Sequence, residues 1–170
     1  IRFDPLVREP HATWALALNY VLHIEETGLT TSPDYPQIFL RMPLCQVGHN
    51  EPLWAPPLSI GESYDYEAEL AIVIGKPGRH ISRENALSHV AGYSCYNEGS
   101  VREYQSQNRQ FGLGKNFERS GSFGPWLVTP DEFGDPTDHG VIFRLNGIER
   151  QNARFDGMLF DCARLISYLS

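Results

Sequence analysis

The sequence lacks the long apolar runs of membrane proteins. No stretch approaches the ~20 consecutive apolar residues that a transmembrane helix needs, and no charged segment followed by an apolar core and a cleavage site marks a secretory signal. Hydrophobic residues still make up 41% of the 170 residues, which is enough for a sizeable core. We therefore expect a soluble protein without a membrane partner, folded as one domain over residues 1–170.

Positive charge is scarce. The chain has 14 basic and 21 acidic residues, which gives a formal net charge of -7 at pH 7. It shows no basic stripe of the kind that a nucleic-acid partner requires, so nucleic-acid binding is not expected. An acidic chain that binds a small anion has to supply local positive charge, either from a few lysines and arginines or from a metal ion.

Cysteine is rare as well, and the chain has no Cys-x-x-Cys motif. The three cysteines are Cys45, Cys95 and Cys162. An odd number of widely spaced cysteines does not make a disulfide framework, so we expect reduced, mostly buried thiols in a cytoplasmic protein. The sequence also lacks a Gly-x-Ser-x-Gly elbow, zinc-ligand spacing among its histidines and a complete P-loop.

Glycine and proline, with 15 and 12 residues, interrupt the chain often and favour a β-rich domain of short elements. Asn146-Gly147 suits a type I′ hairpin, because both turn residues need a positive φ. The segments that predict strands are Gln37–Met42, Tyr64–Ile74, Ala91–Asn97, Leu127–Thr129, Val141–Leu145 and Ile148–Arg150. Those that predict helices are Arg83–Val90 and the amphipathic stretch 158–169, and Trp14–Glu26 predicts a strand followed by a short helix.

The sharpest local feature is the pair Glu67 and Glu69 at the head of the predicted strand 64–74. Strand alternation places both on one face, about 7 Å apart, opposite Leu70 and Ile72. Two like charges entering an apolar strand are costly unless one is protonated or a cation binds between them. Oxygen ligands alone indicate a hard cation such as Mg²⁺, Mn²⁺ or Ca²⁺. The spacing also fits a solvated outer face on an edge strand.

Three further groups of residues carry weaker signals. Glu98 follows a predicted strand and is a candidate third carboxylate ligand, with Ser100 placed to cap a turn on which Arg102 and Gln105 share a face. An ordinary capped loop is the alternative.

His23 and Glu26 have the spacing H-x-x-E. On a helix, the carboxylate can hold the imidazole in one tautomer while the imidazole takes a proton from water. A surface histidine beside an acid is the commoner arrangement. Lys115 is a candidate cation for an anionic substrate, or else a solvated loop lysine.

Taken together, these residues resemble the fumarylacetoacetate hydrolase family, in collinear order from about Trp14 to the end of the chain. The motifs that carry the resemblance are Asn19-Tyr20 with His23 and Glu26, Phe39–Pro43, Tyr66–Lys76, His89–Tyr93, Asn97–Arg102, Gly114–Phe117, Phe123–Thr129, Asn146-Gly147 with Gln151, and Leu165–Ser170. The resemblance implies an α+β, β-rich fold, the mixed β-sheet roll or barrel of the family's C-terminal domain. Because relatives continue into closing strands, this catalytic domain is expected to be truncated after Ser170.

The resemblance also implies a site. Members of the family are Mg²⁺- or Mn²⁺-dependent enzymes that act on 2-oxo acids and β-dicarbonyl compounds, usually as homodimers. The metal ligands would be Glu67, Glu69 and Glu98. The catalytic residues would be His23 and Glu26, as a water-activating pair, and Lys115. The substrate-binding residues would be Arg102, Gln105, Tyr20 and Arg41. Many members have Asp where Glu98 stands and Lys where Arg41 stands.

The expected activity is metal-dependent hydrolysis of a C–C bond in an acylpyruvate or a related β-diketo acid. The ion would act as a Lewis acid, and His23, steered by Glu26, would deprotonate the attacking water. An isomerase, decarboxylase or hydratase that acts on a related 2-oxo acid through a metal-bound enolate remains an alternative. A non-catalytic homologue that binds a metal or a dicarboxylate is another.

Overall fold

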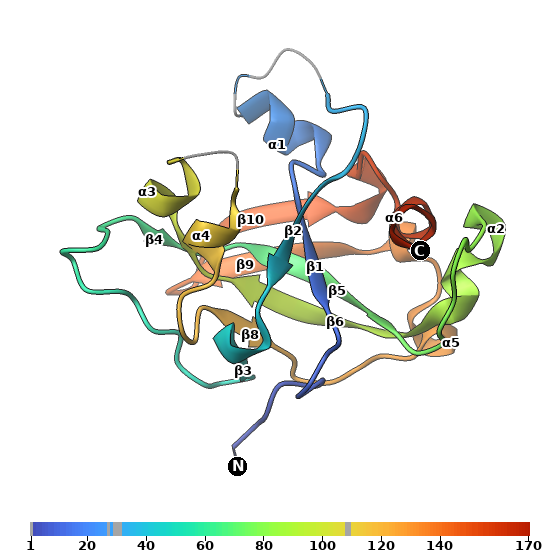
Figure 1. Ribbon diagram of the computed structural model, residues 1–170, viewed down its shortest axis with the longest axis horizontal. Helices are drawn as coiled ribbons and strands as arrows, with labels where there is room; N and C mark the ends of the chain where they lie inside the picture. The colour runs from blue at the N-terminus through green and yellow to red at the C-terminus, as the bar shows by residue number, and fades with distance from the viewer. Residues whose placement is uncertain (1, 27, 29–31, 108–109) are drawn as a thin grey trace. The chain divides into compact units, whose positions relative to one another are not determined.

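The chain is made of short strands and short helices (Figure 1). The computed structural model describes residues 2–26, 28, 32–107 and 110–170. Its strands are β1 Thr13–Ala17, β2 Gln37–Arg41, β3 Gln46–Gly48, β4 Tyr64–Asp65, β5 Ala68–Ile74, β6 Val90–Glu98, β7 Ser100–Val101, β8 Gly121–Phe123, β9 Gly140–Leu145 and β10 Ile148–Arg154. Its α-helices are α1 Val21–Glu26, α2 Arg83–Ala86, α3 Arg102–Gln105, α4 Gly112–Lys115, α5 Pro130–Phe133 and α6 Cys162–Leu169.

The chain divides into two compact units, each built from three segments. Unit 1 comprises Ile1–Ala15, Ile38–Ala71 and Ser94–Leu127. Unit 2 comprises Leu16–Gln37, Ile72–Tyr93 and Val128–Ser170. Within the described residues, no helix is both long and apolar enough to cross a membrane.

The main sheet has the strand order β3-β8-β6-β5. Strands β3 and β8 run parallel, whereas β8 and β6 run antiparallel, and this register sets Glu98 opposite Gly121. Cys45, Val47 and Phe123 are buried in unit 1. The mixed sheet with short helices confirms the predicted α+β, β-rich fold. The described strands form open sheets, and no closed barrel is found among them.

The predicted single strand Tyr64–Ile74 is wrong, because it is broken into β4 and β5. Strand β4 pairs antiparallel with β7, whereas β5 joins the main sheet, so the two halves have different partners. Glu67 therefore lies outside any strand, and the alternation that placed it on one strand face with Glu69 does not apply to it. Ser100 belongs to β7, and Val101 rather than Ser100 is the N-cap residue of α3.

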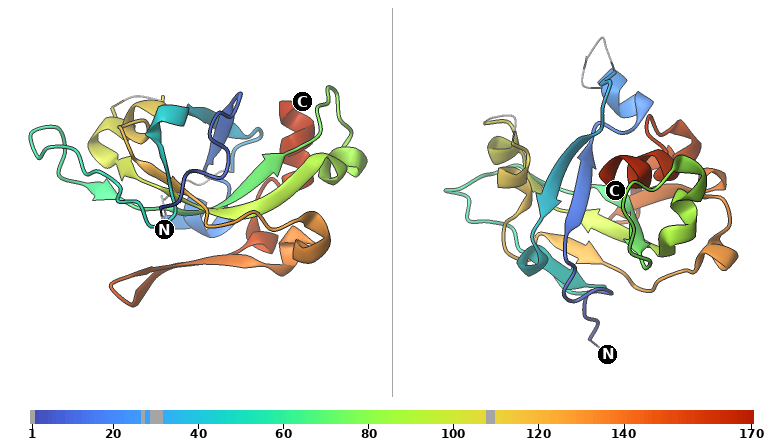
Figure 2. Two further views of the ribbon diagram at one scale, coloured as in Figure 1. Left: turned by 90° about the horizontal axis from the view of Figure 1, so that it is seen from below. Right: turned by 45° about the vertical axis from the view of Figure 1, so that its right-hand side comes forward.

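Unit 2 confirms two of the predicted elements. Strands β9 and β10 form an antiparallel hairpin whose turn residues, Asn146 and Gly147, have φ values of 52° and 80° (Figure 2). The helix predicted over 158–169 is present as α6, but it begins at Cys162, because Asp161 is its N-cap residue and its side chain accepts a hydrogen bond from the Arg164 N–H at 2.8 Å. The same carboxylate pairs with Arg83 of α2, and α2 packs beside α6 (Figure 2).

Two predicted elements of unit 2 are corrected. The expected strand Leu127–Thr129 is a single β-bridge between Tyr93 and Val128, because the following Pro130 starts α5, and proline favours a helix start. The expected helix Arg83–Val90 ends at Ala86. A 3-10 turn over Leu87–His89 follows it, and Val90 already begins β6.

Candidate metal and substrate site

A buried ion-pair cluster in unit 1 joins three of the predicted site residues. Lys115 Nζ, at the end of α4, lies 2.8 Å from both carboxylate oxygens of Glu67 and 2.8 Å from Oε2 of Glu98. The side chains of Lys115 and Glu98 are only 3% and 4% exposed. Residues that are far apart in the sequence thus form a shared, largely desolvated charge network.

Backbone contacts around Gly99 bring the two carboxylates together. The Glu98 N–H donates to the Glu67 carbonyl at 2.8 Å, and the Gly99 N–H donates to the Ser120 carbonyl at 2.7 Å. A Cβ at Gly99 would come within 2.2 Å of the Tyr64 hydroxyl and 2.5 Å of the Ser120 carbonyl oxygen. Only glycine fits between these neighbours, so Gly99 lets the end of β6 pack closely against Tyr64 of β4 and the Ser120 backbone that precedes β8.

Arg102, the first residue of α3, ties the cluster to two further polar side chains. Its Nε and Nη2 donate to Oδ2 of Asp65 at 3.0 and 2.7 Å. Its Nη1 donates to Oε1 of Glu67 at 2.5 Å and to Oε1 of Gln105 at 2.7 Å. The predicted pairing of Arg102 with Gln105 on one face of the turn is therefore present.

Arg41 lies in the protein interior behind Glu98, with 2% of its surface exposed. Its Nη2 donates to Ser120 Oγ at 3.1 Å, its Nε donates to the Tyr96 hydroxyl at 3.2 Å, and the same Nε is 3.6 Å from Oε1 of Glu98. Substrate contact by Arg41 stays a prediction, whereas its contact with Glu98 is a feature of the structure.

The carboxyl groups of the three predicted ligands differ in how their pKa values are shifted. Burial would raise the pKa of Glu67, but Lys115 and Arg102 outweigh burial and lower it. Burial raises the pKa of Glu98, and the charges of Lys115 and Arg41 only partly offset the effect. Burial, followed by the negative charges of Glu67 and Glu98, raises the pKa of Glu69 to about 8. Within the described residues, the Glu69 carboxyl has no hydrogen-bond or ion-pair partner.

The cluster contains four carboxyl groups and three cationic groups, and it is neutral when one carboxyl is protonated. The carboxyl groups belong to Asp65, Glu67, Glu69 and Glu98, and the cationic groups belong to Arg41, Arg102 and Lys115. Carboxylate oxygens are the ligands that Mg²⁺ and Mn²⁺ prefer, and a cation beside a carboxyl with a raised pKa, such as that of Glu69, favours its ionised form. In the present arrangement of the described residues, no three His, Cys, Asp or Glu side chains lie close enough together to hold a metal ion. The acidic residues therefore fit a divalent cation in chemistry and charge, in competition with the Lys115 ammonium.

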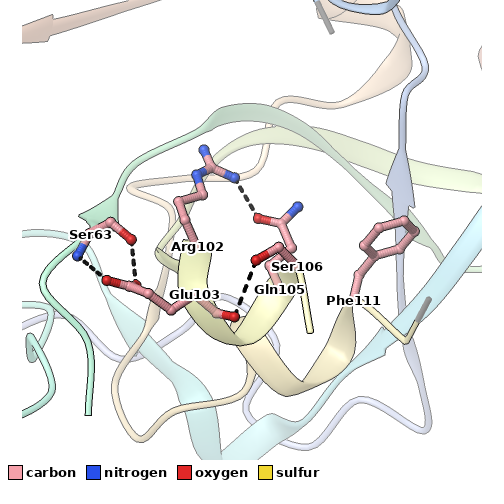
Figure 3. Close-up of a pocket in the computed structure, with 6 residues that line it drawn as sticks. All are labelled: Ser63, Arg102, Glu103, Gln105, Ser106 and Phe111. Atoms are coloured by element: carbon pink, nitrogen blue, oxygen red, sulfur yellow. Dashed lines mark hydrogen bonds between the residues drawn. The ribbon is translucent and has the colours of Figure 1, made fainter. Parts of the chain in front are cut away.

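A cavity of about 490 Å³ has Arg102 of this cluster in its wall, and Figure 3 shows the side chains that line it. Its lining residues are Ser63, Arg102, Glu103, Gln105, Ser106 and Phe111. Glu103 fixes one wall, since it accepts hydrogen bonds from the Ser63 N–H at 3.0 Å and from the Ser63 hydroxyl. The Ser63 hydroxyl, followed by backbone N–H groups that include those of Glu103 and Glu62, lowers the pKa of Glu103 to about 2. Arg102 and Gln105 belong both to the cavity wall and to the network around Glu67.

The remaining predicted site residues lie in unit 2. His23 is exposed on α1, and Tyr20 precedes that helix and forms a β-bridge with Met158. The side chain of Glu26 lies outside the described part of the chain. Asn19 is buried, and its amide group exchanges hydrogen bonds with the Phe160 backbone at 3.0 and 3.1 Å, which anchors the start of α1. The roles of His23, Glu26 and Tyr20 stay predictions.

Sequence reasoning missed two residues of the network, Asp65 and Ser100. Asp65 binds Arg102, and the Ser100 hydroxyl donates to Oε1 of Glu67 at 3.2 Å. A signal for Asp65 was available, because it stands two residues before Glu67 in the alternating series Asp65, Glu67 and Glu69.

Comparison with known proteins supports the family resemblance. The chain is 40% identical over 157 residues to a 2,4-didehydro-3-deoxy-L-rhamnonate hydrolase of Sphingomonas sp. (strain SKA58), covering 92% of this chain and 54% of the relative. It is 36% identical over 166 residues to a mitochondrial oxaloacetate tautomerase of Xenopus laevis, covering 96% of this chain and 51% of the relative. The chain thus spans about half the length of these two curated relatives.

The fold has a counterpart among solved structures. The fumarylpyruvate hydrolase of Pseudomonas aeruginosa, solved in complex with Mn²⁺ and pyruvate, has a TM-score of 0.83 and 29% sequence identity, covering 94% of this chain and 71% of that chain. Residues 12–170 match the family described as fumarylacetoacetate (FAA) hydrolase C-terminal. With this match and the shared mixed fold, the chain belongs to the fumarylacetoacetate hydrolase C-terminal domain family.

Proposed function

We propose that the protein is a divalent-metal-dependent hydrolase that cleaves a C–C bond in an acylpyruvate or a related β-diketo acid. The observation that carries this proposal is the buried cluster in which Lys115 bridges Glu67 and Glu98 beside the unpaired carboxyl of Glu69. The Mn²⁺ and pyruvate bound by the related fumarylpyruvate hydrolase support the choice of ion and of substrate class.

Glu67, Glu69 and Glu98 would hold the ion, Mg²⁺ or Mn²⁺, through their carboxylate oxygens. When bound, the ion supplies Lewis-acid polarisation of a carbonyl oxygen. With Glu69 ionised, the four carboxylates, the three cationic side chains and a divalent ion together carry one net positive charge. That charge attracts the carboxylate of a 2-oxo acid into an otherwise acidic protein.

Two side chains of unit 1 would act directly on the substrate. Lys115 is the buried cation that can balance the negative charge developing on the leaving group. Gln105 presents its carbonyl oxygen to Arg102, because a guanidinium can only donate hydrogen bonds. Its NH₂ group is therefore left to donate to a substrate oxygen in the cavity of Figure 3.

The proposed base for the attacking water is His23. It lies on the short helix α1, three residues before Glu26, and this spacing lets a carboxylate fix the imidazole tautomer. A histidine suits the task because its ordinary pKa lies near neutral pH.

Product analysis by NMR tests the proposal. The protein is incubated with Mn²⁺ or Mg²⁺ and a panel of acylpyruvates, and we expect pyruvate and a carboxylic acid in equal amounts. A chelator should stop the reaction. Glu69→Gln should stop it too, whereas Glu51→Gln, which removes a carboxylate paired with Arg119 elsewhere in unit 1, should not. Cleavage that continues in the chelator would contradict the metal dependence, and intact substrates throughout would contradict the hydrolase assignment.

A tautomerase is the second candidate, favoured by the similarity to the oxaloacetate tautomerase of Xenopus laevis. Moving a proton between carbon and oxygen needs a polarised carbonyl and a base but no attacking water. In D₂O, this activity would interconvert enol and keto oxaloacetate and exchange the C3 hydrogens without releasing a carboxylic acid from acylpyruvates. Repeating the NMR experiment with oxaloacetate in D₂O, beside the acylpyruvate panel, therefore separates the two candidates.

A further inference from the structure

Asp65 lies at the edge of the cluster, where its backbone and both of its carboxylate oxygens have partners. In β4 it pairs with Ser100 of β7, a residue that is completely buried. Its Oδ1 accepts the N–H of Tyr66 at 2.9 Å, and its Oδ2 accepts two N–H groups of Arg102. These contacts orient the half-exposed carboxylate of Asp65 toward Arg102.

Asp65 determines which edge of the Arg102 guanidinium faces the site. Four of the five N–H groups of Arg102 have partners, and the two donated to Asp65 use the Nε and Nη2 edge. Nη1 donates its two N–H groups to Glu67 and Gln105, and the second N–H of Nη2 has no partner within the described residues. An arginine fork ordinarily pairs with a carboxylate through two parallel hydrogen bonds, but here Glu67 receives a single one.

The single bond leaves the two oxygens of Glu67 unequal. Oε1 accepts from Arg102, Ser100 and Lys115, whereas Oε2 accepts from Lys115 alone. Oε2 is therefore the oxygen with capacity for another cation. If Arg102 turned its Nε and Nη2 edge toward Glu67, it would engage both oxygens and remove that capacity.

We propose that Asp65 is a positioning residue, which holds Arg102 so that Oε2 of Glu67 stays available to the metal ion. This inference rests on the proposed role of Glu67 as a metal ligand. Residues that orient metal ligands typically change metal affinity by about 10–100-fold when they are replaced. Asp65 is not one of the proposed metal ligands, and its carboxylate binds Arg102, so its effect would pass through Arg102.

Isothermal titration with Mn²⁺ tests the proposal. We expect Asp65→Asn to weaken Mn²⁺ binding by about 10-fold or more, and Asp65→Glu to restore part of the affinity because it keeps the charge. Glu51→Gln is the matched control, since Glu51 also pairs with an arginine of unit 1, at 3.0 Å, but contacts none of the cluster. Circular dichroism melts of each variant without metal report whether it has folded.

A double-mutant comparison isolates the path through Arg102. In an Arg102→Met background, Asp65→Asn should change the Mn²⁺ affinity by less than about twofold, because the residue it positions is gone. An equal loss in both backgrounds would show that Asp65 acts through strand pairing and would overturn the proposal, as would unchanged affinity in Asp65→Asn alone. Glu67→Gln separates failure of the positioning role of Asp65 from failure of the ligand role of Glu67. If Glu67→Gln abolishes Mn²⁺ binding while Asp65→Asn does not weaken it, only the positioning role fails, whereas unchanged binding in Glu67→Gln overturns the ligand assignment itself.

Discussion

Replacing Lys115 by methionine removes the ammonium that bridges two carboxylates at 2.8 Å. Methionine is similar in length and apolar, so the main loss is electrostatic. Taking one partner from a buried ion pair costs about 3–5 kcal/mol, because the remaining charge is left buried and unpaired. We therefore expect the metal-free variant to lose about 3–5 kcal/mol of its free energy of unfolding.

The same substitution should strengthen metal binding. In the wild-type protein a bound divalent ion would compete with the Lys115 ammonium for the oxygens of Glu67 and Glu98. Without that competition, even about 1.4 kcal/mol of the released interaction would tighten binding by about tenfold. Turnover should fall nonetheless, since Lys115 is proposed to balance charge during the reaction.

Urea unfolding and Mn²⁺ titration measure both effects. Unfolding is followed once in chelator and once in excess Mn²⁺, and the stability lost in chelator should be largely recovered in Mn²⁺. Lys76→Met is the matched control, because Lys76 is exposed and is the chain's other lysine. A Lys115→Met protein with wild-type stability in chelator and unchanged or weaker Mn²⁺ binding would refute the reasoning.

Three further predictions follow from the same geometry. The pKa of Glu69 is raised from 4.5 to about 8, so its contribution to metal-free stability is complete below pH 4.5 and is lost as the pH rises through 8. Glu69→Gln should therefore make the free energy of unfolding less dependent on pH, by up to about 1.4 kcal/mol per pH unit. Thermal melts from pH 5 to 9 measure this, and a pH profile identical to that of the wild-type protein would contradict it. Gly99→Ala should cost about 1–3 kcal/mol, because its Cβ would meet the Tyr64 hydroxyl and the Ser120 carbonyl; unchanged urea midpoints would show that this contact can relax. His23→Ala should lower kcat by about 10²–10⁴-fold with Mn²⁺ affinity unchanged, and unchanged turnover would remove His23 from the mechanism.

Elements with a local cause could be predicted from the sequence. The hairpin at Asn146-Gly147 depends on two positive φ angles that these residues tolerate, and α6 depends on apolar spacing within one segment. The break in Tyr64–Ile74 has no local cause. It arises because β4 and β5 pair with different strands, and alternating residues carry no information about their partners.

The ion-pair network could be anticipated only in part. The series of acidic residues around Glu67 indicated a cation, but Lys115 bridges Glu67 and Glu98 from 48 and 17 positions away. Arg41 shows the limit most clearly, because its partners Tyr96 and Ser120 follow 55 and 79 residues later. A buried arginine is stable only with such partners, so its place in the core cannot be inferred from its neighbours in sequence.

The central claim is that the carboxylates of unit 1 hold a divalent ion on which the 2-oxo acid chemistry depends. Its most direct test is isothermal titration of Mn²⁺ into the wild-type protein and into Glu98→Gln, followed by pyruvate formation from acylpyruvates in the same samples. The account predicts one Mn²⁺ per wild-type chain, weaker binding in Glu98→Gln, and pyruvate formation that rises in step with bound Mn²⁺. Equal Mn²⁺ binding by both proteins, or pyruvate formed without Mn²⁺, would contradict it.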